Sequence, residues 1–171
     1  KLVVVGGAPY AGEYIKQVHR AGDPRVIFPG YLFGPGYWEL QRNAYAFCAP
    51  TEVGGTHPVI LEALAAGNCV IVNDHAPNVE TVGDAGLTFS GKEGVPALTA
   101  QLERILAEPD LVQEYRDRAC ERAKRYSWDA VTDEYEELLR HAVEMRGPGL
   151  LPPELCDPAG EPAPVVAAAA P

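Results

Sequence analysis

Glu62 is the residue of this sequence whose surroundings point most directly to chemistry. It stands in an otherwise apolar stretch from Pro58 to Ala66, which predicts a helix with nearly every face buried. An ionised carboxylate in such surroundings is costly unless it has hydrogen-bond donors. Those donors are either a backbone N–H or an arginine elsewhere in the fold, or the hydroxyl groups of a ligand. A ribose diol would supply two donors at a spacing that suits one carboxylate.

A loop of small residues precedes this helix and is the second candidate. Gly54 and Gly55 are followed by Thr56, His57 and Pro58. Glycines let the backbone approach a phosphate closely, and the start of a helix favours negative charge. Thr56 or His57 would either cap the helix or contact phosphate, whereas Pro58 suits the first helical position. The loop therefore predicts a binding site for the diphosphate of a nucleotide.

Two apolar runs flank the loop and the helix. Residues 44–49 indicate a buried strand before the loop, and residues 69–72 indicate a second strand after Gly67 and Asn68 have ended the helix. This βαβ unit would place the start of its helix at the carboxyl edge of a parallel sheet, where α/β proteins bind ligands. Helical side chains lean toward the N-terminus, so Glu62 is expected to point toward the mouth of the loop.

The segment TEVGGTHPVILEALAAGNCVIVND, with PNVETVGDAGLTF after it, resembles the donor-binding half of retaining GT-B glycosyltransferases of the family 4 type. The family pattern is E-G-F-G-x-x-x-x-E-A-x-A-x-G-x-P-V-I. Glu62 matches its second Glu and is followed by Ala63, Ala65 and Gly67 in place. The resemblance covers roughly residues 1–140, and it is specific as a whole more than in any single piece.

The first Glu of that pattern falls on Gly54, which is a departure from the family. Glu52 lies two residues too early to take its place. The VGGTHP form of the loop is similar to a subgroup that includes rhamnosyltransferase-like enzymes, whose loops also carry glycines here. The loss of the first Glu makes a non-catalytic nucleotide-sugar or protein-binding module a credible alternative to a transferase. A nucleotide-sugar epimerase of GT-B shape is a further alternative.

The resemblance implies that a sugar is transferred from a nucleotide-diphosphate sugar to a glycan, a lipid or a small molecule. Donor binding would then involve Glu62 and the loop from Gly54 to Pro58. The strand RVIFP would end beside the base, so Gly30, Tyr31 and Leu32 are expected to contact it through backbone atoms, unless they form an ordinary strand-end turn. Gly6 and Gly7 are only a weak sign of a dinucleotide site, because a third glycine position is missing.

The resemblance also implies that further parts of the protein are needed for sugar transfer. In the family, a strand carrying an Arg and a Lys that clamp the diphosphate would lie before Lys1, and so would the acceptor-binding domain. The chain opens inside a predicted strand, so we expect an N-terminally truncated domain that binds donor weakly and transfers nothing alone. No cofactor and no obligatory metal are expected.

The whole pattern predicts an α/β fold, Rossmann-like, with one mainly parallel sheet of about five strands and helices on both faces. The strand at residues 44–49 is expected inside this sheet, away from its edges. The remaining strands are predicted at residues 2–5, 25–29, 69–72 and 86–89. Helices are predicted at residues 10–21, 37–43 and 58–66, with one short helical turn within residues 75–82.

Three further helices close the predicted domain, with Ser127 as the cap of the last. Apolar residues repeat at helical spacing along each of them, and these stripes are expected in the core. They are Leu98, Leu102, Ile105 and Leu106; Leu111, Tyr115, Ala119 and Ala123; and Trp128, Val131, Tyr135, Leu138 and Ala142. The domain is thus expected to span residues 1–146, and the proline- and alanine-rich residues 147–171 are expected to form a flexible tail.

Composition excludes several partners. The formal net charge of the 171 residues is −10, which disfavours nucleic acid because its binding relies on Lys and Arg. No run of about 18 apolar residues is present, so no transmembrane segment is predicted. The four cysteines lie far apart without metal-ligand spacing, which favours a reduced, cytoplasmic setting. Any peripheral membrane contact would come from the half that these residues lack.

Overall fold

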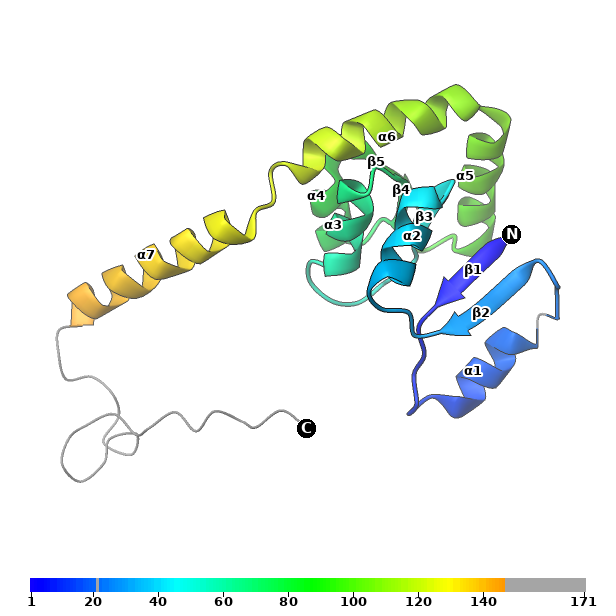
Figure 1. Ribbon diagram of the computed structural model, residues 1–171, viewed down its shortest axis with the longest axis horizontal. Helices are drawn as coiled ribbons and strands as arrows, with labels where there is room; N and C mark the ends of the chain where they lie inside the picture. Colours follow the sequence, from blue (N-terminus) through cyan, green and yellow to red (C-terminus); the bar gives the residue numbers. More distant parts are fainter. Residues whose placement is uncertain (21, 147–171) are drawn as a thin grey trace. The chain divides into compact units, whose positions relative to one another are not determined.

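The structure is a computed structural model that describes residues 1–20 and 22–146. The chain divides into two compact units, Lys1–Arg125 and Tyr126–Pro171. In order, the elements of the first unit (Figure 1) are β1 (Leu2–Val5), α1 (Gly12–His19), β2 (Val26–Gly30), α2 (Pro35–Asn43), β3 (Ala46–Ala49), α3 (Pro58–Ala65), β4 (Cys69–Asn73), α4 (Ala76–Val82), the 3-10 turn Gly83–Ala85, β5 (Gly86–Phe89), α5 (Val95–Ala107) and α6 (Pro109–Ala123). The second unit contains α7 (Trp128–Arg146).

The strands form two parallel sheets and not one. β1 pairs with β2, while β3, β4 and β5 form a second sheet in that order. The α/β class with parallel strands flanked by helices is confirmed, but the single sheet of about five strands is not. The strand from residues 44–49, observed as β3, lies at the edge of its sheet, so its predicted interior position is wrong.

The two groups of strands match parts of a known strand order. A doubly wound sheet commonly has the strand order 3-2-1-4-5-6. On either side of strand 1, that order has a two-stranded group, 3-2, and a three-stranded group, 4-5-6, and the two sheets observed have the same sizes and orders. Pro29 in β2 lacks a backbone N–H, which suits a strand with an unpaired edge.

The core is built around β4, which is buried along its whole length. Its side chains alternate between two apolar clusters, as they must when both faces of a sheet are covered. Val70 and Val72 pack with residues of α3 and α6, whereas Cys69 and Ile71 pack with residues of α5 and the start of α6. The prediction of helices on both faces is therefore confirmed for this sheet.

Most predicted elements agree with the structure to within two residues at each end. The exception is the segment 75–82, where we expect one short turn and the structure has the seven-residue helix α4. This helix is longer because its side chains Asn78, Thr81 and Val82 are buried in the fold. Of the predicted stripes on α5 and α6, Ile105 and Ala119 are buried, whereas Leu106 is 69% exposed.

The second unit, described by itself, contains one helix within residues 126–146. The hydroxyl of Ser127 accepts a 3.4 Å hydrogen bond from the N–H of Ala130, at the predicted cap position. The stripe along α7 is not buried: Trp128, Tyr135 and Leu138 are 82%, 63% and 62% exposed. Within residues 126–146 this helix is the single element, so the stripe has no apolar surface opposite it there, and its packing in a core stays a prediction. The compact first unit ends after Arg125, before the predicted domain boundary at residue 146, and the predicted tail lies outside the described residues.

No helix among residues 1–20 and 22–146 combines the length and the apolar character that crossing a membrane requires.

The cysteines on β3 and β4 provide a test of the core. Burial raises the pKa of the Cys48 thiol to about 11, and burial likewise raises the pKa of Cys69 to about 11, with Arg116 acting in the opposite direction. Cys120 is exposed. At pH 8 a thiol with a pKa of 11 is ionised in roughly one molecule in a thousand, and the thiolate is the reactive form.

We therefore expect a C120S/C156S variant to react very slowly with a disulfide reagent at pH 8 until denaturant is added. The unfolded thiols have lower pKa values and ionise first as the pH rises, so these two groups make the fold less stable from about pH 9 toward pH 11. Thiol titration followed at 412 nm measures the reaction. Rapid reaction of the folded variant would show that β3 and β4 open readily.

Candidate functional site

The loop between β3 and α3 has the backbone geometry that a glycine provides. Gly54 has a φ of 124°, a conformation that other residues rarely adopt. Pro58 is the first residue of α3, and His57 is the residue before it, without a hydrogen bond from its side chain to the helix. The predicted cap by Thr56 or His57 is therefore wrong. Among the described residues, no side chain caps the start of this helix with a hydrogen bond, so its backbone amides keep their capacity to bind an anion.

Two residues of the β4–α4 segment hold this loop in place. Nε2 of His75 lies 2.9 Å from the carbonyl oxygen of Gly54, and Nδ2 of Asn78 donates a 2.9 Å hydrogen bond to the carbonyl of Thr51. Asn78 is fully buried, and its Oδ1 has no partner among the described residues. Neither residue is predicted from the sequence, since each acts across more than twenty positions of the chain. They fix the loop against α4.

The His57 ring lies beside Gly54, the position where this chain departs from the family pattern. A Cβ atom built on Gly54 would lie 3.0 Å from Nε2 and 3.1 Å from Cε1 of the His57 ring. Nδ1 of the same ring is buried without a hydrogen-bond partner among the described residues. The imidazole therefore stands directly against the position where the family's first Glu would begin.

Glu62 is partly buried on α3, and its partner is a tyrosine. The hydroxyl of Tyr37 on α2 donates a short hydrogen bond to Oε2 of Glu62. Neither of the protein partners considered from the sequence, a backbone N–H or an arginine, is the one found. Oε1 of Glu62 has no hydrogen bond within the described part of the chain. Glu52 is exposed in the loop, as its polar surroundings predict.

The predicted base-contact turn follows β2. Gly30 has a positive φ of 76°, and Leu32 is partly buried. Tyr31 makes a side-chain contact that the sequence does not predict: its hydroxyl donates a 2.6 Å hydrogen bond to the carbonyl of Gly7. Its ring also stacks on Phe33 at 6.2 Å between centroids, with both rings largely exposed. Among the described residues, no hydrogen bond or ion pair joins this turn to the 54–58 loop.

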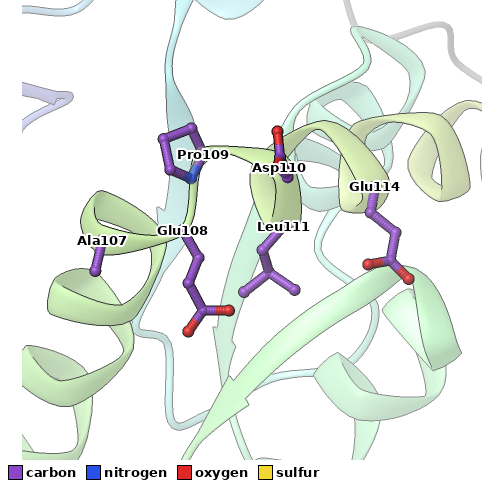
Figure 2. A pocket seen from close by; sticks show the side chains of 6 residues that line it. All are labelled: Ala107, Glu108, Pro109, Asp110, Leu111 and Glu114. Atoms are coloured by element: carbon purple, nitrogen blue, oxygen red, sulfur yellow. The ribbon is translucent and has the colours of Figure 1, made fainter.

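A hollow of the surface lies away from these residues, at the junction of α5 and α6. Figure 2 shows its lining, which is Ala107, Glu108, Pro109, Asp110, Leu111 and Glu114. The end of α5 lies at the amino edge of the sheet, where the Tyr45 hydroxyl, just before β3, donates to the Ile105 carbonyl at 2.7 Å. Three carboxylates line the hollow, two of them in ion pairs with Arg104 and Arg118, and no lining side chain is a cation that could hold a diphosphate. The carboxyl edge is therefore the better candidate.

The described residues contain no group of three or more His, Cys, Asp or Glu side chains arranged to hold a metal ion.

The fold and the loop together define a class of protein. It is a Rossmann-like α/β domain whose candidate ligand site lies at the carboxyl edge of a parallel sheet, at the start of a helix. The family model described as "Glycosyl transferases group 1" matches residues 1–108. The chain belongs to this family.

Several known proteins are similar to this chain. A phosphatidyl-myo-inositol mannosyltransferase of Mycolicibacterium smegmatis is 32% identical over 155 residues, which cover 88% of this chain and 38% of that protein. Sucrose-phosphate synthase from Thermosynechococcus elongatus has a TM-score of 0.69 at 24% identity, with 84% of this chain and 39% of that chain covered. Anabaena HepE in complex with UDP and glucose has a TM-score of 0.73 at 18% identity, covering 81% and 40%. At these identities the two structures show a shared fold, and the chain spans less than half the length of each of the three proteins.

Proposed function

We propose that this chain is the donor-binding part of a retaining glycosyltransferase of the family 4 type. It would bind a nucleotide-diphosphate sugar, whose sugar is transferred to a glycan, a lipid or a small molecule. Membership of the glycosyltransferase family supports this proposal, as do structural neighbours described in complex with UDP or UDP-glucose. A cytoplasmic location and catalysis without a cofactor or an obligatory metal are parts of the same proposal.

The observation that carries the proposal is the position of Glu62, one helical turn after the uncapped start of α3. The helix begins at the Gly54–Pro58 loop without a side-chain cap, so its amides and dipole can receive the diphosphate. Glu62 lies one turn further along the same helix, with Oε2 held by Tyr37 and Oε1 without a hydrogen bond among the described residues. We assign Oε1 to the ribose hydroxyls. The turn at Gly30, Tyr31 and Leu32 is assigned to the base.

Residues outside this chain would complete the enzyme. An additional strand would fit between β1 and β3 in the order described above, and the family resemblance places on it an Arg and a Lys that clamp the diphosphate. An acceptor-binding domain would supply the other side of the site. We propose that the transferase consists of all three parts.

Isothermal titration of the 171-residue chain with UDP, GDP, ADP and dTDP tests donor binding. We expect at least one of them to bind weakly, on the order of 0.1–1 mM, because the charge-assisted bonds of the Arg and Lys are absent. Absence of binding by all four at millimolar concentrations would contradict the proposed function.

The same chain is expected to transfer no sugar when a nucleotide sugar and an acceptor are added. The reason is that it lacks both the basic clamp and the acceptor side. Release of nucleoside diphosphate, followed by a coupled assay, measures turnover. Any turnover above that of a Glu62→Gln preparation would show that residues 1–171 are catalytically sufficient.

A second candidate function is a module that binds a nucleotide sugar without transferring it. The observation in its favour is that the His57 ring lies 3.0 Å from the Cβ position of Gly54, so a Glu at this position would require the ring to shift. A longer chain that carries the acceptor half distinguishes the two. Transfer by that chain supports the transferase, and tight donor binding without transfer or hydrolysis supports the module.

A further inference from the structure

The hydroxyl of Tyr37 has a fixed direction. Nε2 of Gln41, one turn along α2, donates a 3.0 Å hydrogen bond to it, so the hydroxyl accepts from the amide and its own proton is free for Glu62. Burial, and then the hydrogen bond to Glu62, raise the pKa of Tyr37 above its usual value. The group therefore remains a protonated donor at neutral and mildly alkaline pH.

The buried side-chain amide of Asn68 holds Gln41 in place. Nδ2 of Asn68 donates to the backbone carbonyl of Gln41 at 2.8 Å and lies 3.2 Å from its Oε1. The same amide lies 3.3 Å from the carbonyl of Ala63 on α3. Gln41 is 5% exposed and Asn68 is fully buried. A continuous chain of polar contacts thus runs from the Ala63 carbonyl of α3 through Asn68, Gln41 and Tyr37 to Glu62.

The two oxygen atoms of the Glu62 carboxylate differ in their hydrogen bonding. Oε2 is satisfied by Tyr37, so the carboxylate can be partly buried without a ligand. Oε1 has no hydrogen bond among the described residues and keeps its full capacity as an acceptor. A carboxylate held at one oxygen has less rotational freedom to lose when a ligand binds at the other.

We propose that Tyr37 is a positioning residue for donor binding, which fixes Glu62 so that Oε1 accepts hydrogen bonds from the ribose diol of a nucleoside diphosphate. This inference rests on the proposed function, and it goes beyond it by assigning a role to a residue of α2. Tyr37 acts through Glu62 and not by contact with the reacting atoms.

Tyr37→Phe tests the role, with titration of the 171-residue chain by UDP and by 2′,3′-dideoxy-UDP. GDP and its dideoxy form replace them if GDP binds better. We expect the variant to bind UDP about three- to tenfold more weakly than the wild type, because an unfixed carboxylate must be ordered by the ligand. The dideoxy nucleotide has no ribose hydroxyls, so the variant and the wild type should bind it equally. In a Glu62→Ala background, where no side chain is left for Tyr37 to position, Tyr37→Phe should change UDP affinity by less than about twofold.

Tyr45→Phe is the matched control. It also removes a tyrosine hydroxyl hydrogen bond, 2.7 Å to the carbonyl of Ile105, but at the amino edge of the sheet. It should leave UDP affinity unchanged while thermal unfolding reports its structural cost. If Tyr37→Phe binds both nucleotides as the wild type does, or loses the same factor for both, the positioning role is overturned and the proposed function stands. If the wild type binds no nucleotide, both fail. Should Tyr37→Phe unfold, the Glu62→Gln variant decides: an equal loss of affinity for UDP and for its dideoxy form would overturn the ribose contact on which the role depends.

Discussion

Replacing Glu62 by Gln is expected to weaken nucleoside diphosphate binding by about tenfold or more while the fold survives. A hydrogen bond to a charged group contributes about 1.5–3 kcal/mol, and roughly 1.4 kcal/mol corresponds to tenfold in affinity. The amide oxygen of Gln can still accept the hydrogen bond from Tyr37, so the substitution removes the charge and leaves the protein contact in place. Calorimetric titration measures the affinity, and thermal unfolding verifies the fold.

Glu52→Gln is the matched control for this experiment. Glu52 lies exposed in the same loop, where water can satisfy its carboxylate, so we expect a change of less than about threefold. Equal losses in the two variants would mean that Glu52 takes over the role of the family's first Glu. A large loss only at Glu52 would contradict the assignment of the ribose contact to Glu62.

Local periodicity predicted the elements of this fold because their buried faces appear in the sequence as apolar residues at helix or strand spacing. The run at Cys69 to Val72 is apolar at every position, and β4 is buried on both faces. The division into two sheets could not be predicted in this way. Strand pairing depends on which strands are present to fill each edge, and the apolar character of β1 and β3 contains no information on their neighbours.

The helix α7 shows a second limit of periodicity. Its apolar residues recur at helical spacing as strongly as those of α6, yet Ala119 on α6 is fully buried and Tyr135 on α7 is 63% exposed. A stripe of apolar residues shows that a helix has an apolar face, but it does not show which element that face packs against. The partner must be found in the tertiary structure.

The candidate site was predicted in part for a similar reason. The glycine loop and Glu62 lie within nine residues of one another, so their relation follows from helix geometry alone. Tyr37 lies 25 residues before Glu62, and no spacing rule connects α2 with α3. The Gly54 conformation and its contact with His57 likewise depend on the backbone path of a loop, which residue types do not specify.

Restoring the family's first carboxylate by Gly54→Glu is expected to damage the site and not to improve it. The φ of 124° at Gly54 is one that a residue with a Cβ rarely adopts, and a strained conformation of this kind costs about 1–3 kcal/mol. The new Cβ would also meet the His57 ring at 3.0 Å, so the ring or the loop must move. We therefore expect the free energy of unfolding to fall by about 1–3 kcal/mol, and nucleoside diphosphate binding to weaken as the loop shifts.

Gly55→Glu is the control variant: it adds the same charge to the loop without the backbone strain and the ring contact of Gly54→Glu. A Cβ at Gly55 meets nothing within 4 Å, and Gly55 has no positive φ, so the same carboxylate one residue later should change stability by less than about 0.5 kcal/mol. Denaturant unfolding compares the two variants. Gly54→Glu combined with His57→Ala should recover only part of the loss, because the substitution relieves the ring contact but not the backbone strain. A Gly54→Glu protein as stable as Gly55→Glu, and with tighter nucleotide binding than the wild type, would show that the loop can accept the family's Glu after all.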